Sequence, residues 1–180
     1  MEAMQYIENR TYDEIQVGDS ASLVRTLKPQ DIQLFAIMSG DVNPSHVDPE
    51  YAKSSMFQEV IAHGMWGGAL ISTVLGTQFP GPGTIYVDQT LHFSRPVGLG
   101  DTITVTLTAT RKFDHNHHIL FDCVCTNQDG QTVIRGTAEV LAPTEKIKRP
   151  RVELPEVTLV DREARYQHLL ERTRGLAPIP

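Results

Sequence analysis

The sequence predicts a domain of the α+β class, in which one buried helix packs against an antiparallel sheet. Residues 60–87 contain no Asp, Glu, Lys or Arg, and their helical part has the composition of a helix inside a protein. Residues 102–110 alternate between apolar and hydroxyl side chains, which is typical of a half-buried antiparallel strand. A chain of 180 residues, 40% of them hydrophobic, is long enough for one sizeable core.

The first elements of the domain are a strand and a helix. Residues 21–27 have the composition of a strand. Pro29 suits the first turn of a helix, because its missing N–H needs no partner there. Apolar residues of this helix share one face, and Gly40 is expected to end it, which places Asp41 just beyond the last turn.

Four further segments are predicted as strands. Residues 85–93 are expected to form one strand, because Pro and Gly residues bound them on both sides. Residues 102–110, 119–125 and 132–141 follow as an antiparallel meander. Asp129-Gly130 supplies the hairpin turn before the last strand.

The uncharged helix after Ala62 contains three glycines near its beginning. Gly64, Gly67 and Gly68 each disfavour a helix by about 1 kcal/mol relative to Ala, so another backbone or a ligand is expected to pass close by. The unpaired N–H groups of such a helix start can hold an oxyanion. The alternative is that these glycines only allow tight packing of the helix on the sheet. The apolar stretch is too short to span a bilayer, which needs roughly 20 residues.

Residues 39–46, Ser-Gly-Asp-Val-Asn-Pro-Ser-His, are the best candidate for a catalytic centre. They place the carboxylate of Asp41 and the imidazole of His46 in one loop after the first helix. Such a pair can divide proton abstraction and proton donation on one water molecule. The alternative is that Asp41 and Asn43 shape a turn, while His46 packs against the core.

These segments together carry a family resemblance. Residues 39–46, Ala52, residues 62–65 and residues 93–97 resemble those of MaoC-like, (R)-specific enoyl-CoA hydratases, and the resemblance covers residues 12–142. It implies a hot-dog fold, in which a curved antiparallel sheet wraps a long central helix, and a homodimer or higher homo-oligomer. It also implies the addition of water to trans-2-enoyl-CoA thioesters.

The resemblance assigns roles to residues at the matching positions. It implies that Asp41 and His46 are the catalytic pair, with Asp41 as the base and His46 as the group that orients water and then donates a proton. The Gly64 N–H would donate to the thioester carbonyl, and Ser72 would support it. Asn43 would orient the water or the loop. The reaction requires no metal and no redox cofactor.

Further residues are candidates for contact with the substrate. His63 precedes Gly64 and could assist binding, although a histidine satisfied by hydrogen bonds at the helix entry is the simpler interpretation. Met65 is expected in the core or in the acyl pocket. Arg95 is a candidate cation for the phosphates of CoA. Trp66, Tyr86 and Phe93 are, like Met65, expected in the core or in the acyl pocket. Lys53, Arg111 and Lys112 are, like Arg95, candidate cations for the phosphates of CoA.

Two clusters that could indicate a metal or redox site are interpreted as structural. His115, His117 and His118 lie between two predicted strands without a matching ligand set, so an exposed hairpin loop explains them. Cys123 and Cys125 fall on one face of a single strand, where they are expected to be reduced core thiols.

Composition and the chain ends limit the possible partners and location. The formal net charge of -6 disfavours nucleic acid. The first ten residues lack the features of a secretory signal, so we expect no membrane anchor and a cytoplasmic location. Residues 143–180 are predicted as a charged, Pro-containing linker, followed by a helical segment at residues 161–170. This tail weakly resembles the entry into a phosphate acyltransferase domain, to which such hydratases can be fused.

Two other functions fit the same fold. A hot-dog thioesterase would hydrolyse the acyl thioester instead of hydrating it. A non-catalytic acyl-CoA-binding or assembly module would keep the fold without using the acid–base pair.

Overall fold

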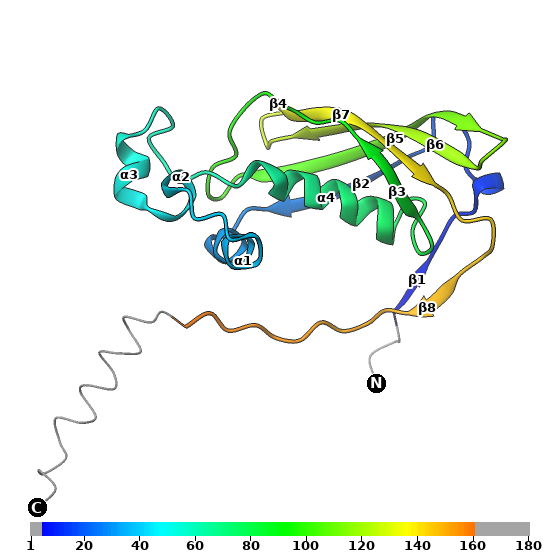
Figure 1. Ribbon diagram of the computed structural model, residues 1–180, viewed down its shortest axis with the longest axis horizontal. Coiled ribbons are helices and arrows are strands. Elements are labelled where there is room, and N and C mark those ends of the chain that lie inside the picture. Colours follow the sequence, from blue (N-terminus) through cyan, green and yellow to red (C-terminus); the bar gives the residue numbers. More distant parts are fainter. Residues whose placement is uncertain (1–4, 161–180) are drawn as a thin grey trace, which may run out of the picture.

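The structure is a computed structural model that describes residues 5–160. One curved antiparallel sheet and one long helix form its main body (Figure 1). Neighbouring strands in the sheet follow the order β2, β5, β6, β7 and β3, and β4 also pairs with β7. The strands are β2 (Ser20–Thr26), β3 (Ile85–Gln89), β4 (His92–Phe93), β5 (Thr102–Phe113), β6 (His118–Thr126) and β7 (Thr132–Leu141).

The predicted meander is confirmed in β5, β6 and β7. Buried and partly exposed residues alternate along β5 and β6, and β7 has the predicted bounds. Gly130 has a φ of 72° in the turn before β7, which favours glycine. The apolar face of these strands therefore contributes most of the core against which the helix packs.

The prediction of one strand over residues 85–93 is wrong. The chain forms β3 and β4 instead, with a break at Thr90 and Leu91, although both strands pair with β7. At this break the backbone of Thr90 lies directly over Gly136, so closely that a Cβ at Gly136 would overlap the Thr90 carbonyl. The break therefore has a long-range cause, which the local pattern of the strand does not contain.

The central helix is α4 (Gly64–Thr77), as predicted in type and position. Its buried side includes Ile71, Val74 and Leu75, each at most 1% exposed. The expectation that the whole helix is buried is wrong, because a second side of α4 is exposed in this chain. The absence of charge between Glu59 and Asp88 therefore does not follow from burial within one chain.

Helix α1 (Pro29–Ser39) begins at the predicted proline, and Gly40 ends it in the left-handed conformation with a φ of 77°. The predicted loop at residues 39–46 is only partly correct, since α2 (Pro44–Val47) begins within it. The Asn43 side chain accepts a hydrogen bond from the Ser45 N–H and caps α2. Two short helical elements complete the set: α3 (Pro49–Ser54) and the 3-10 helix η1 (Tyr12–Glu14).

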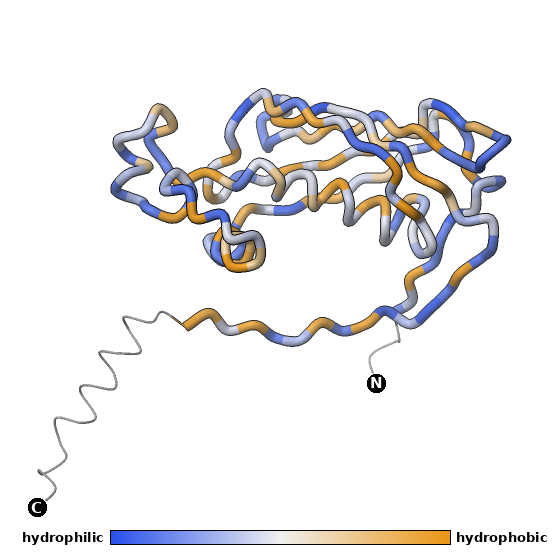
Figure 2. The backbone as a smooth tube through the Cα atoms, in the orientation of Figure 1, coloured by the Kyte–Doolittle hydropathy of each residue, from blue (hydrophilic) through white to orange (hydrophobic). Residues whose placement is uncertain are grey.

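The segment after Pro143 contains a strand that the sequence did not predict. β8 (Lys148–Pro150) pairs with β1 (Tyr6–Glu8), so the two ends of the described chain run together (Figure 1). Residues 151–160 continue in an extended conformation, with alternating apolar and polar residues in Figure 2. The helix predicted at residues 161–170 lies outside the described residues. Within residues 5–160, no helix combines the length and apolar character needed to cross a bilayer.

Candidate active site

Three helix ends bring Asp41, His46 and His63 together. Asp41 follows the carboxyl end of α1, His46 lies on α2, and His63 immediately precedes α4. A carboxylate oxygen of Asp41 and one ring nitrogen from each histidine all lie within 4.8 Å of one another. Asp41 and His46, which the sequence predicts as a pair, are thus adjacent in space.

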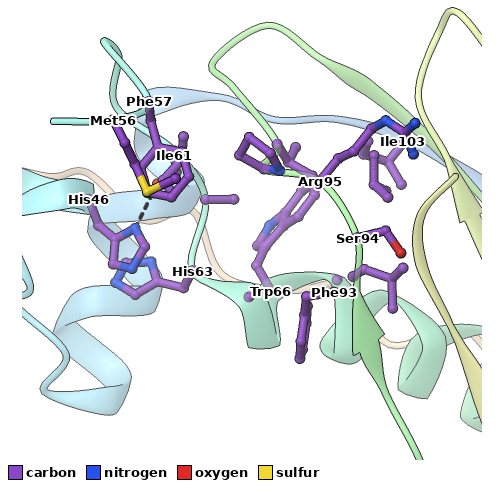
Figure 3. A pocket seen from close by; sticks show the side chains of 17 residues that line it. His46, Met56, Phe57, Ile61, His63, Trp66, Phe93, Ser94, Arg95 and Ile103 are labelled. Atoms are coloured by element: carbon purple, nitrogen blue, oxygen red, sulfur yellow. Dashed lines mark hydrogen bonds between the residues drawn. The ribbon is translucent and has the colours of Figure 1, made fainter. Parts of the chain in front are cut away.

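One nitrogen of His46 is held by the backbone. His46 Nδ1 lies 2.8 Å from the carbonyl oxygen of Ile61, as the dashed line in Figure 3 marks. Because a carbonyl oxygen only accepts hydrogen bonds, Nδ1 carries the hydrogen. Nε2 is therefore the nitrogen of His46 that is available to exchange a proton with a ligand.

His63 contacts both members of the pair. Its Nε2 donates a hydrogen bond to the backbone carbonyl of Asp41 at 2.9 Å. Its ring stacks against the ring of His46, with 4.1 Å between centroids, and against Phe35 of α1 at 4.8 Å. The expectation of a hydrogen-bonded histidine at the helix entry holds for Nε2, whereas the buried Nδ1 has no partner among residues 5–160.

The Asp41 carboxylate is exposed in this chain. One of its oxygens accepts a hydrogen bond from the Asn43 N–H at 3.1 Å, and the Asp41 N–H donates to Ser39 Oγ at 3.2 Å. These short-range bonds shape the turn, as the structural alternative predicted for Asp41 and Asn43. They leave the second carboxylate oxygen free for a water molecule or a ligand.

An apolar cavity of about 410 Å³ opens beside the histidine pair. In Figure 3, His46 and His63 lie at one end of it, and Ser94, Arg95 and Ile103 lie at the other. Gly64 lines the cavity as the first residue of α4, where its N–H has no partner within the helix. The cavity thus combines an apolar wall, a free backbone donor and an imidazole.

The other predicted substrate contacts are divided between the cavity and the surface. Arg95 lines the cavity, and its guanidinium donates to the Thr132 carbonyl at 2.8 Å. Met65 and Ser72 lie on the exposed side of α4 and do not line this cavity. Asn43 caps α2 and contacts Asp41 through its backbone.

Most of the cavity wall was not predicted from the sequence. Trp66 and Phe93 line it, as the sequence suggested, whereas Tyr86 does not. Further apolar lining residues come from residues 55–60, which show no helix or strand periodicity, and from predicted strands, whose period-two pattern does not reveal which buried side chains border a cavity. These further lining residues include Met56, Phe57, Ile61, Ile103, Val133 and Ile134.

The groups near Asp41 are only partly available to hold a metal ion. His46 Nδ1 and His63 Nε2 both donate to carbonyl oxygens, and a nitrogen that carries a hydrogen cannot be a ligand. The atoms that remain without a hydrogen are an Asp41 oxygen, His46 Nε2 and the buried His63 Nδ1, and three such atoms are fewer than the four protein ligands of a closed metal site. The Asp41 carboxylate and His46 Nε2 can accept two hydrogen bonds from one water molecule.

The remaining candidate clusters are structural. His115 and His117 lie in the turn between β5 and β6, and His118 pairs with Glu139 at 2.6 Å. Lys112, predicted as a possible phosphate contact, donates to the carbonyl groups of Tyr12 and Ile15.

Cys123 and Cys125 are free and fully buried, as predicted. Burial raises the pKa of Cys123 to about 12 and that of Cys125 to about 11, so both are protonated thiols at neutral pH.

A long helix wrapped by an antiparallel sheet, with a carboxylate and an imidazole at the start of the helix, defines a hot-dog protein with a candidate acid–base site. Residues 14–124 match the family model of the MaoC like domain. The chain belongs to the MaoC-like family.

Curated relatives extend over most of the described domain. The chain is 46% identical to an (R)-specific enoyl-CoA hydratase of Rhodospirillum rubrum over 132 residues, which are 73% of this chain and 91% of that protein. It is 34% identical to an (R)-specific enoyl-CoA hydratase of Aeromonas caviae over 129 residues, covering 72% of this chain and 96% of that one.

Solved structures agree with the fold. The R-hydratase PhaJ1 of Pseudomonas aeruginosa superposes with a TM-score of 0.83 at 44% identity, covering 87% of this chain and all of that one (100%). The (R)-hydratase of A. caviae superposes with a TM-score of 0.70 at 34% identity, covering 72% and 98%. The predicted hot-dog fold and family are confirmed.

Proposed function

We propose that this protein adds water reversibly to trans-2-enoyl-CoA and forms (R)-3-hydroxyacyl-CoA. The observation that carries the proposal is that Asp41 lies beside His46, and that His46 lines an apolar cavity which Gly64 also lines. The relatives named as (R)-specific enoyl-CoA hydratases support the same reaction and stereochemistry.

The proposed mechanism begins with the thioester carbonyl. The Gly64 N–H donates to this oxygen, draws electron density from C3 and stabilises the enolate-like transition state. Asp41 removes a proton from water as its oxygen bonds to C3. His46, in its imidazolium form, delivers a proton from Nε2 to C2, while Nδ1–H stays on the Ile61 carbonyl. Asp41 then returns the proton that it gained to His46, which restores both groups.

The cavity is proposed to hold the acyl chain. Its wall consists largely of apolar side chains, among them Trp66 and Phe57, and a hydrocarbon chain there would be shielded from water. Arg95 is exposed at the end of the cavity away from the histidines, so the acyl chain, and not the CoA arm, would run towards it.

Hydration of a short trans-2-enoyl-CoA tests the proposal. We expect loss of enoyl absorbance and formation of the (R)-3-hydroxyacyl product by the wild type. Asp41→Asn and His46→Gln are each expected to lower kcat about 100- to 10,000-fold, because each removes one proton-transfer group. Release of free thiol would identify a thioesterase instead. Binding of enoyl-CoA without turnover would identify a non-catalytic module.

We also propose that the protein acts as a homodimer. The exposed side of α4 carries Met65, Ala69, Ser72 and Thr73, none of them charged. β3 is an edge strand of the sheet (Figure 1), and its residues 85–88 are exposed. Sedimentation of the purified protein tests this proposal, since a monomer at micromolar concentration would contradict it. The cytoplasmic location and the fusion to a phosphate acyltransferase domain stay predictions of the sequence.

A further inference from the structure

His63 is a buried histidine whose presence the stability of the core does not explain. Its side chain is 3% exposed, and its Nδ1 has no hydrogen-bond partner among residues 5–160. A buried nitrogen without a partner is uncommon and unfavourable. An apolar ring would fill the same space beside Phe35 without this disadvantage.

Two contacts of His63 lead to the proposed catalytic pair. The Nε2–H donates to the Asp41 carbonyl across 22 positions of the chain, and the ring covers one face of His46. Residues 41–43 are otherwise exposed, and the side-chain bonds that hold Asp41 come from its near neighbours Ser39 and Asn43.

Its place in the chain connects these contacts to the oxyanion donor. His63 is the residue before Gly64, whose N–H is proposed to bind the thioester carbonyl. The side chain of His63 does not cap α4, so it leaves the Gly64 N–H free, while the His63 carbonyl accepts from the Trp66 N–H. His63 thereby contacts Asp41 and His46 and directly precedes Gly64 at the start of α4.

We propose that His63 is a positioning residue, which fixes Asp41 through a hydrogen bond and the ring plane of His46 through stacking. This inference rests on the proposed hydratase function. It differs from both interpretations of the sequence, in which His63 assists substrate binding or is only a hydrogen-bonded residue at the helix entry. Groups that must act on one water molecule need placement within a fraction of an ångström, and supporting residues supply it.

Two substitutions separate the two contacts. His63→Phe keeps a ring between His46 and Phe35 but removes the N–H donor. His63→Gln keeps an N–H donor for the Asp41 carbonyl but removes the ring. Each is expected to lower kcat about 10- to 100-fold with KM changed less than about threefold, because a misplacement of about 1 Å costs up to about 100-fold in rate. His63→Ala lacks both contacts and is expected to lower kcat further.

His118→Gln is the matched control. His118 is also a partly buried histidine with a side-chain partner, Glu139, but it does not line the cavity. Its substitution is expected to leave kcat within about twofold of the wild type. If His63→Phe and His63→Gln also stay within twofold, or change only KM, the positioning role is wrong.

A spectroscopic measurement distinguishes failure of this inference from failure of the proposed function. The Val42 amide nitrogen shares a peptide group with the Asp41 carbonyl, so its NMR signal reports the hydrogen bond from His63. His63→Phe should shift this signal while the His46 ring signals keep a ring-current shift from the stacked phenyl ring, and His63→Gln should leave the Val42 signal in place and remove the ring-current shift from the His46 signals. This result needs no turnover, and unchanged signals in both variants would overturn the inference even if the wild type proves to have another activity.

Discussion

Compared with the strands β5, β6 and β7, the region around Asp41, His46 and His63 is exposed and incompletely hydrogen-bonded. Val105, Leu107 and Phe121 in the strands are 0% exposed. In the site, by contrast, the Asp41 carboxylate is exposed, and a buried nitrogen of His63 lacks a partner among residues 5–160. The sheet is arranged as stability alone requires, whereas the site retains polar groups that stability does not explain.

The largest expected effect is the destabilisation of the sheet by a substitution at Gly136. In Gly136→Ala, the new Cβ would overlap the backbone of Thr90, which cannot move without breaking the Thr90–Thr137 hydrogen bonds. We expect a loss of about 4 kcal/mol or more in the free energy of unfolding, measured by chemical denaturation.

Gly76→Ala is the control for this substitution. Gly76 lies in α4, and a Cβ added there would have no neighbouring group within 4 Å, so alanine should stabilise the helix by about 0.5–1 kcal/mol. Equal stabilities of the two variants would contradict the close approach of Thr90 to Gly136.

The second expected effect is a loss of activity without a loss of stability. Gly64→Pro removes the proposed oxyanion donor at a position where proline fits a helix start. His63 has φ of -57° and ψ of 133°, a conformation that is compatible with a following proline. We expect kcat to fall about 100- to 1,000-fold, measured on a short enoyl-CoA, while the thermal unfolding temperature changes little.

Gly64→Ala keeps the N–H and serves as the matched variant. Its Cβ would lie 3.1 Å from Cε1 of Phe93, so both variants disturb this ring, but only proline lacks the donor. A kcat for Gly64→Pro equal to that for Gly64→Ala would argue against a role of this N–H in catalysis.

The smallest expected effect is a pH dependence of the sheet. Burial raises the pKa of Cys123 to about 12 and that of Cys125 to about 11 in the folded protein, against about 8.5 in an unfolded chain. Above about pH 9 the unfolded chain therefore binds fewer protons than the folded one, and the free energy of unfolding decreases as pH rises towards 11. Below about pH 8.5 the folded and the unfolded chain both keep these protons, so the two thiols do not lower the free energy of unfolding there.

Cys123→Ala tests the pH dependence. At pH 10 we expect the thiol to contribute a destabilisation on the order of 1 kcal/mol relative to pH 8, which the alanine variant would lack. Denaturation curves at the two pH values measure it, and Cys125→Ala provides a second comparison. Parallel pH profiles of the wild type and both variants would contradict the raised pKa values.

Local sequence patterns determined several elements of the fold. The period-two pattern predicted β7 with its bounds, Thr132–Leu141, because alternate residues of a strand face the core. Pro29 and Gly40 marked the ends of α1, since proline and glycine have distinctive backbone preferences. The motif at residues 39–46 selected Asp41 and His46 as a pair only together with the family resemblance, and the structure places the two residues side by side.

Only the tertiary structure decided how these parts meet. It brought His63 onto both Asp41 and His46, broke the predicted strand where Thr90 crosses Gly136, and paired β1 with β8. The tertiary structure also decided which side chains, Phe57 among them, form the cavity wall. Each of these features depends on contacts between residues far apart in the chain. A local pattern records the conformation of a segment and which of its faces is buried, but not which distant group that face will contact.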